Sequence, residues 1–167
     1  KRSEVAAMSH VQPNPYKRRK PNRSSIWNLA LDGQRDGSST TANGDSYVGE
    51  WQNDQKHGHG TFTYIEGDCY IGAWVRDKKH GAGTYTTVEG GKYTGDWRDD
   101  QIHGRGVYVS QDGEQYEGDF QKGKRHGSGT FIFSSGNSYA GYWEDGAMEG
   151  IGTLTCTNGT VYEGEWH

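Results

Sequence analysis

The chain has 167 residues, of which only 30% are hydrophobic, with 27 glycines and a formal net charge of −4 at pH 7. This length suits one ordinary domain, but the composition excludes a conventional interior of leucine, isoleucine and valine, and no apolar run is long enough for a transmembrane helix. Aromatic residues are frequent, at 13%, so we expect buried surface to come from rings packed on backbone.

The first predicted segment, residues 1–36, is an extended basic N-terminal arm. Residues 1–30 carry seven lysines and arginines against one acidic residue, a net charge of +6, whereas residues 31–167 carry −10. Three prolines between positions 13 and 21 favour extended chain. The cluster is either a solvated tail or an anchor for an anionic surface such as tubulin, an acidic lipid or an acidic protein, and KRRK also matches a minimal nuclear-import pattern. Its basic residues are Lys17, Arg18, Arg19, Lys20 and Arg23.

From residue 37 onward the chain repeats itself with a period of 23 residues. An anchor of tyrosine, glycine and a second ring occurs six times at this spacing, as YVGEW, YIGAW, YTGDW, YEGDF, YAGYW and YEGEW. A glycine pair keeps the same register, in HGHG, HGAG, HGRG, HGSG and EGIG. We therefore expect a repeat array over 37–167, with a half unit at 37–46, five full units at 47–161 and the start of a sixth at 162–167.

Within each unit the hydrophobic period is two, which is typical of β-strands. In the first unit Tyr47 and Trp51 fall on one face, and Val48 and Glu50 on the other. Polar stretches such as QNDQK and glycine turns such as EGD separate the strands. The predicted fold class is all-β, an elongated single-layer antiparallel sheet of stacked 23-residue β-hairpins.

The glycines and rings predict an aromatic stripe along one face of that sheet. Glycine has no Cβ, so a ring can lie on bare backbone beside it. The rings either pack mainly on one another or also bind a partner, because a single-layer sheet has no second layer to cover its apolar face. The predicted partner-binding groove comprises Tyr47, Trp51, Tyr70, Trp74, Tyr93, Trp97, Tyr116, Phe120, Tyr139 and Trp143.

The residues that could suggest chemistry recur with the repeat, which argues against an active site. His57, His80, His103 and His126 recur at the 23-residue period, and equivalent residues of neighbouring hairpins lie roughly 10 Å apart, too far to share a metal ion. We expect them to make structural hydrogen bonds beside the glycine pair. Repeated carboxylates such as Glu50 do not form the one asymmetric pair that acid–base catalysis needs. We predict no catalytic residue, no metal site and no cofactor.

The pattern YxGEWxxxxxHGxGxxxxxxGxx resembles the MORN repeat, and the resemblance covers residues 37–167. It implies a curved single sheet of hairpins, no catalytic site within the repeats, and a groove that binds protein segments. The repeats are also similar to those of ciliary and flagellar members of this family, including radial-spoke head proteins. Four positions depart from the pattern: Ala73 and Tyr142 replace the acidic residue, Phe120 replaces tryptophan, and Glu149 replaces histidine.

The resemblance implies a non-enzymatic scaffold of a motile cilium or flagellum, in the axoneme, at the radial spoke or on the doublet microtubule. The expected partners are other proteins of a large ciliary assembly, with tubulin a candidate; neither nucleic acid nor a small-molecule substrate is expected. Free thiols at Cys69 and Cys156 suit a reducing compartment, so the expected location is the cytoplasm and its cytoskeleton. The alternatives are a membrane-junction scaffold that binds acidic phospholipid and a regulatory module of a longer enzyme.

Overall fold

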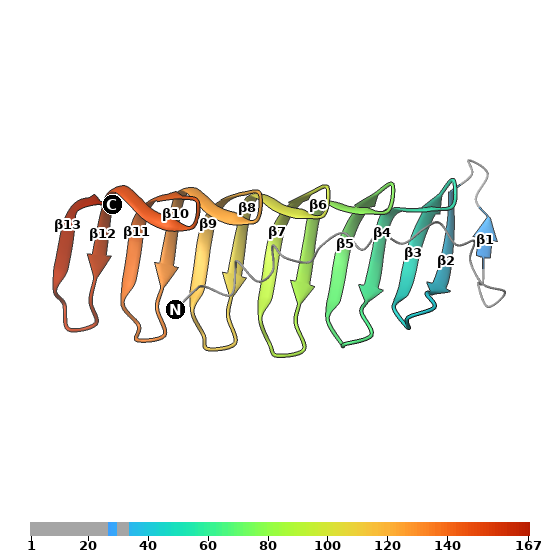
Figure 1. The fold of residues 1–167 in the computed structure, drawn as a ribbon, viewed down its shortest axis with the longest axis horizontal. Coiled ribbons are helices and arrows are strands. Elements are labelled where there is room, and N and C mark those ends of the chain that lie inside the picture. Colours follow the sequence, from blue (N-terminus) through green and yellow to red (C-terminus); the bar gives the residue numbers. More distant parts are fainter. Residues whose placement is uncertain (1–26, 30–33) are drawn as a thin grey trace.

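The computed structural model describes residues 27–29 and 34–167, the first three as backbone only. The described strands form one antiparallel sheet, in which their order across the sheet is their order along the chain. The hairpins stand side by side along the long axis of the molecule (Figure 1). The strands are β1 (Trp27–Leu29), β2 (Gln34–Thr40), β3 (Ser46–Gln52), β4 (Gln55–Thr63), β5 (Cys69–Val75), β6 (Lys78–Thr86), β7 (Lys92–Arg98), β8 (Gln101–Val109), β9 (Gln115–Gln121), β10 (Lys124–Ile132), β11 (Ser138–Glu144), β12 (Ala147–Thr155) and β13 (Val161–Trp166).

Two kinds of turn connect the strands. Within the first unit, β3 and β4 are joined at Asn53 and Asp54, whose φ angles are 51° and 61°. Two successive positive φ angles are typical of a type I′ turn, whose twist matches that of the strands it joins. Between units the chain passes through a glycine turn, such as the one at Gly67 with φ 101°. Both kinds of turn lie where the sequence predicts them.

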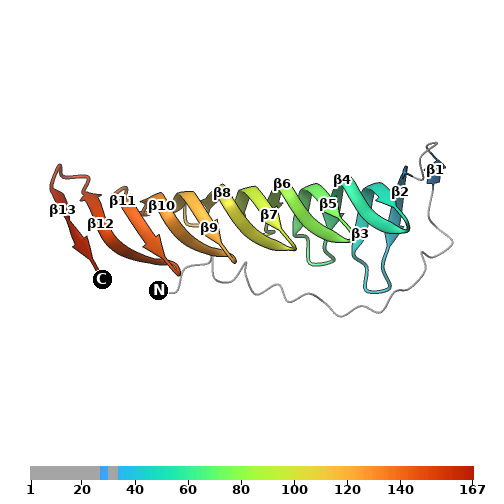
Figure 2. The same ribbon diagram turned by 90° about the horizontal axis from the view of Figure 1, so that it is seen from above.

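A β-bulge interrupts the hairpin beside the glycine pair. Gly49 pairs with Gly60 and Trp51 pairs with Lys56, which leaves one residue of β3 opposite three of β4. Gly58, at the centre of those three, has φ 59°, a left-handed conformation that glycine adopts without strain. The repeat pattern does not predict this bulge, but the alternation of faces is kept across it, since Lys56 and Gly60 pair with Trp51 and Gly49. Bulges bend strands and increase their twist, and the strands curve strongly when the sheet is seen from above (Figure 2).

The sheet buries one face and exposes the other. Tyr47 and Trp51 are 1% and 7% exposed, whereas Val48, between them in sequence, is 61% exposed. We call the side that carries Tyr47 and Trp51 the ring face, and the opposite side the outer face. The buried hydrophobic residues of the described chain form a single cluster. The predicted all-β, single-layer sheet of hairpins is confirmed.

The sheet begins nearer the N-terminus than the sequence predicts. Trp27 of β1 pairs with Gly37 of β2, and β2 begins at Gln34, so the C-terminal part of the predicted arm, residues 1–36, contributes to the sheet. Residues 1–26, which include the basic cluster, lie outside the described residues.

Candidate partner-binding surfaces

Tyrosine and tryptophan rings form a continuous ladder on the ring face. The Tyr47 ring lies 5.0 Å from the Trp51 ring and 5.4 Å from the Trp74 ring of the next unit, measured between centroids and edge to face in both cases. Such pairs are worth about 0.5–1.5 kcal/mol beyond their buried area, so the ladder couples each unit to the next. The same two contacts recur at Tyr70, Tyr93, Tyr116 and Tyr139.

Paired glycines make room for the tyrosine rings. A Cβ added at Gly60 would lie 2.2 Å from the hydroxyl oxygen of Tyr47, and one added at Gly83 would lie 2.3 Å from that of Tyr70. Non-bonded heavy atoms prefer separations of roughly 3.5–4.0 Å, so no side chain fits at either position. The glycine pair therefore recurs because the rings rest on its backbone, as the sequence predicts.

The polar ends of the buried rings bond to the backbone. The Tyr47 hydroxyl donates to the carbonyl oxygen of Glu50 at 2.9 Å, and Nε1–H of Trp74 donates to that of Gly60 at 3.2 Å. The same bonds recur along the array, except that Phe120 has no donor to offer. Burial raises the pKa of Tyr47, because desolvation disfavours the phenolate. These hydroxyls therefore act as neutral structural donors.

All ten residues of the predicted groove lie in this ladder, and each is at most 7% exposed. Self-packing, one of the two alternatives, thus describes these rings in the isolated chain. Contact with a partner stays a prediction for them, and it would involve the side chains that border the rings. These partly buried hydrophobic residues include Phe62, Tyr64, Phe133, Met148 and Leu154.

One side chain from each unit lies over the rings, and together these side chains form a row that the sequence pattern does not predict. Nζ of Lys56 lies 4.4 Å from the ring centroid of Trp74, and Nζ of Lys79 lies 4.9 Å from that of Trp97. The 23-residue spacing of these residues could have indicated the row. It is hard to recognise because the residue type changes from unit to unit. The row consists of Lys56, Lys79, Ile102, Arg125 and Met148.

Burial changes the acid–base behaviour of the two lysines in this row. Desolvation lowers the pKa of Lys79 to about 8, while Asp100 acts to raise it and Lys56 to lower it. Burial also lowers the pKa of Lys56. The surrounding rings stabilise an ammonium group by cation–π contact, but they also exclude the water that would solvate it.

An aspartate in the hairpin turn links two neighbouring units on this side of the sheet. Oδ1 of Asp100 accepts a hydrogen bond from the backbone N–H of Lys79 at 2.9 Å, and the N–H of Asp100 donates to the carbonyl of Lys79 at 3.1 Å. Asp77 makes the same pair of bonds one unit earlier. In the two later units the equivalent residues are Gly123 and Gly146, which supply the backbone donor but no side-chain acceptor. The carbonyl of Gly146 accepts from Nη2 of Arg125 at 2.8 Å instead.

Carboxylates make the side-chain hydrogen bonds beside the bulge. Oε1 of Glu50 accepts from the backbone N–H of His59 at 2.7 Å, and the equivalent aspartates of the third and fourth units do the same at 3.2–3.3 Å. The structural hydrogen bonds that we predict for the histidines are thus made here by the acidic residue of the YxGEW anchor. Ala73 and Tyr142, which replace that residue, leave the second and fifth units without this bond.

Within residues 34–167, no group of three or more histidine, cysteine, aspartate or glutamate side chains is placed to hold a metal ion. Cys69 and Cys156 are free thiols. No helix in the described part of the chain is long and apolar enough to span a membrane.

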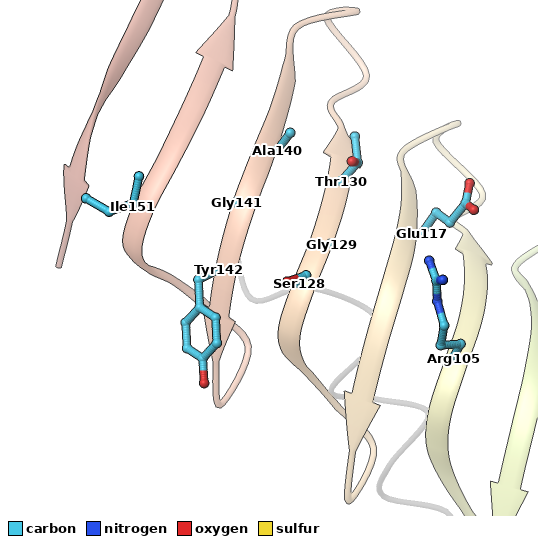
Figure 3. A pocket seen from close by; sticks show the side chains of 9 residues that line it. All are labelled: Arg105, Glu117, Ser128, Gly129, Thr130, Ala140, Gly141, Tyr142 and Ile151. Atoms are coloured by element: carbon cyan, nitrogen blue, oxygen red, sulfur yellow. The ribbon is translucent and has the colours of Figure 1, made fainter.

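The outer face has a hollow of about 610 Å³ that extends from Arg105 of the third unit over the fourth and fifth units. Arg105 and Glu117 stand at one end, Tyr142 and Ile151 at the other, and bare backbone at Gly141 lies between them (Figure 3). In the sequence, Tyr142 is recognisable only as a departure from the repeat. The repeat pattern does not predict the hollow, because it is formed by residues of five strands, β8 to β12, and the side chains around its repeated glycines differ from unit to unit.

Comparisons with known proteins identify the repeat. A family model described as "MORN repeat" matches residues 47–69, 70–92, 93–115, 116–138 and 139–161. A search of curated proteins found no match.

Two solved structures show a limited similarity in shape. The TCP domain of SAS-4 (dCPAP) of Drosophila melanogaster, in complex with a proline-rich motif of Ana2 (dSTIL), is 14% identical over 91% of this chain and 86% of that chain, with a TM-score of 0.49. A catalytically inactive virginiamycin B lyase from Staphylococcus aureus with quinupristin is 7% identical over 85% of this chain and 74% of that chain, with a TM-score of 0.21. With TM-scores this low, neither likeness carries an argument about function.

Proposed function

Because the chain belongs to the MORN-repeat family, we propose that it is a non-enzymatic scaffold that holds partner chains along its sheet. MORN-repeat proteins are generally structural or binding modules, and the family match indicates no enzyme. The observation that carries the proposal is the architecture of the described sheet. Its strands are hydrogen-bonded in an unbroken series and its core is made of its own rings, which supports a stiff platform whose faces and edges are available for binding.

On the ring face, the proposed partner is an extended protein segment that runs across the hairpins. The ten ladder rings form the base of this surface, and half-buried side chains such as Phe62 and Phe133 border it. Apolar side chains that are only partly covered gain further burial when a partner binds. A second mode is strand addition at the sheet edge, since β13 has an unpaired side among the described residues.

We further propose the axoneme of a motile cilium or flagellum, at the radial spoke or on the doublet microtubule, as the location of this scaffold. The support is the similarity of GDSYVGEWQNDQKHGHGTFTY, residues 44–64, to the repeats of ciliary family members. The basic cluster at residues 17–23 would then bind an anionic partner, with tubulin a candidate. The acidic array favours a role of this kind for the arm, because residues 31–167 carry a net charge of −10.

Site-specific photo-crosslinking tests docking on the ring face. A photoreactive amino acid replaces Phe62 or Phe133 in the full chain, which is then incubated with an extract of motile cilia. We expect these positions to crosslink to the same axonemal protein. The control position is Val48, which is exposed on the outer face of the first unit. Crosslinks from Val48 alone would contradict docking on the ring face.

A second experiment separates the ciliary proposal from a membrane scaffold. Vesicles that contain phosphoinositides are floated with the full chain and with a variant that has glutamine at the five basic positions from Lys17 to Arg23. Binding to vesicles that depends on these positions and weakens with added salt would favour the membrane alternative. Retention on salt-washed axonemes, with no flotation, is the result we expect.

A further inference from the structure

The hollow on the outer face is a non-repeating feature of a repeating array. At the position of Ala140, the first and second units carry Val48 and Ile71, whose larger side chains are 61% and 58% exposed. The small side chain of Ala140 and the bare backbone at Gly141 leave the surface low here (Figure 3). The fifth unit therefore offers a depression at a position where the first and second units carry a projecting apolar side chain and the fourth carries Glu117.

One end of this hollow is an exposed apolar wall. Tyr142 is 41% exposed and Ile151 is 74% exposed. At the position of Tyr142 three other full units carry an acidic residue, and at that of Ile151 the fourth unit carries Ser128. Tyr142 makes no bulge-capping hydrogen bond of the kind that Glu50 makes. Nothing in the repeat framework thus requires a large ring at this position.

Acidic side chains lie at one end of the hollow and on the strand beyond the other end. Glu117 lies in its lining on β9, and on β13 Glu163 and Glu165 pair across the strands with Thr153 and Ile151. All three glutamates are exposed. The one cation in the lining is Arg105, whose Nε lies 4.0 Å from Oδ1 of Asp119. Within the lining Glu117 and Arg105 balance each other, so the acidic excess comes from Glu163 and Glu165 beyond Ile151, where Oε1 of Glu165 lies 4.0 Å from Nε2 of His167. This excess favours a positively charged partner.

We propose that this hollow is a docking site for an extended basic protein segment in which one apolar side chain is flanked by lysines or arginines. The apolar side chain lies over Gly141 against Tyr142 and Ile151, where it removes exposed apolar surface from water. The flanking cations face Glu117 on one side and Glu163 and Glu165 on the other. This site lies opposite the ring face, so the scaffold can hold a second partner without displacing the first.

The binding test uses the full chain and a short synthetic peptide with one phenylalanine between two pairs of lysines. Fluorescence anisotropy of the labelled peptide measures affinity. The variant Tyr142→Ala/Ile151→Ser introduces residues that the array itself carries at those positions, namely Ala73 and Ser128, so it is expected to fold. We expect the variant to bind the peptide roughly tenfold more weakly, because the apolar anchor contacts are lost.

Two further variants test charge and position. Glu117→Thr copies Thr94 of the third unit, and it is expected to weaken binding about threefold at low salt and less at high salt. Ile71→Thr removes an exposed apolar residue of the outer face far from the hollow, and it should leave affinity unchanged. A peptide with glutamates in place of the lysines should not bind.

The proposal is overturned if the native chain and the Tyr142→Ala/Ile151→Ser variant bind the lysine peptide equally, or if Ile71→Thr weakens binding as much. It is also overturned if the glutamate peptide binds as well as the lysine peptide. Circular dichroism of each variant confirms that the sheet is folded. The result is independent of docking on the ring face, because every substituted residue lies on the outer face.

Discussion

The first two full units, residues 47–92, and the last two, residues 116–161, share one ladder of rings but cover it with different side chains. Over the early rings lie Lys56 and Lys79, and the nearby Tyr85 hydroxyl donates to a carboxylate oxygen of Asp68. Over the late rings a guanidinium group takes the place of an ammonium in the fourth unit, where Cζ of Arg125 lies 4.3 Å from the ring centroid of Trp143, and the rest of the cover is apolar. It includes Phe131, Phe133, Met148 and Leu154.

This difference separates the residues that build the array from those that give each part its chemistry. The ring–glycine contacts are nearly the same in both regions: an added Cβ would lie 2.3 Å from the tyrosine hydroxyl at Gly83 and at Gly129. Side chains above the ladder are not needed for that contact and vary from unit to unit. Charge, and with it the kind of partner that each region attracts, can therefore change along the array without a change of fold.

The largest expected effect tests whether the framework is the same in both regions. Gly83→Ala and Gly129→Ala should each lower the free energy of unfolding by about 3 kcal/mol, since the new Cβ overlaps a buried tyrosine. Urea unfolding followed by tryptophan fluorescence measures this loss. The control is Gly113→Ala, where a Cβ meets nothing within 4 Å but φ is 82°, so about 1 kcal/mol of backbone strain is expected. If Gly83→Ala or Gly129→Ala lowers the free energy of unfolding no more than Gly113→Ala does, the two regions do not share one framework.

The second prediction concerns the buried lysine that distinguishes the early region. The folded-state pKa of Lys79 is about 8, whereas a lysine in the unfolded chain has a pKa near 10.4. Between these values the unfolded chain binds more protons, so the contribution of Lys79 to stability rises with pH, by on the order of 1–2 kcal/mol between pH 8 and pH 9.5. Buried tyrosines act in the opposite direction, but only from about pH 10, where tyrosine ionises in the unfolded chain.

Lys79→Met, which copies Met148 of the late region, should remove the contribution of Lys79 to the rise in stability with pH. The matched control is Lys78→Met, because the side chain of Lys78 is 53% exposed and its loss should leave the pH dependence in place. Thermal unfolding at pH values from 7 to 9.5 measures the slope. Equal slopes for the two variants would show that Lys79 is not the titrating group.

The smallest expected effect concerns the acidic residue beside the bulge. Glu50→Ala removes the acceptor for the His59 N–H and for Nε2–H of Gln34, and it should cost about 1 kcal/mol. Tyr142→Ala removes no such bond and should change the free energy of unfolding by less than about 0.5 kcal/mol. Chemical denaturation of both variants measures the difference, and a larger loss for Tyr142→Ala would mean that its ring supports the fold.

The fold could be predicted in large part from the sequence, because its signal is periodic. Tyr47 and Trp51 at alternating positions, with glycines at constant offsets, are sufficient to indicate hairpins and a single sheet. The bulge at Gly58 was missed, because it depends on how many residues of β4 oppose Glu50 rather than on the pattern within one strand. The sheet also extends to β1, whose short segment carries no copy of the repeat.

The candidate surfaces were predicted less completely. All ten proposed groove residues lie on one face, yet spacing could not show that the rings of successive units cover one another. Nor could it show that Lys79 lies over Trp97, or that Tyr142 and Ile151 stand beside the low surface at Gly141.

Strands, turns and ring–glycine pairs follow from the sequence because each depends on residues within one 23-residue period and its neighbour. The burial of Lys79 and the hollow on the outer face follow only from the tertiary structure. Both depend on side chains of successive units meeting across a bulged and twisted sheet, and on desolvation and exposed area that exist only once those units are packed together.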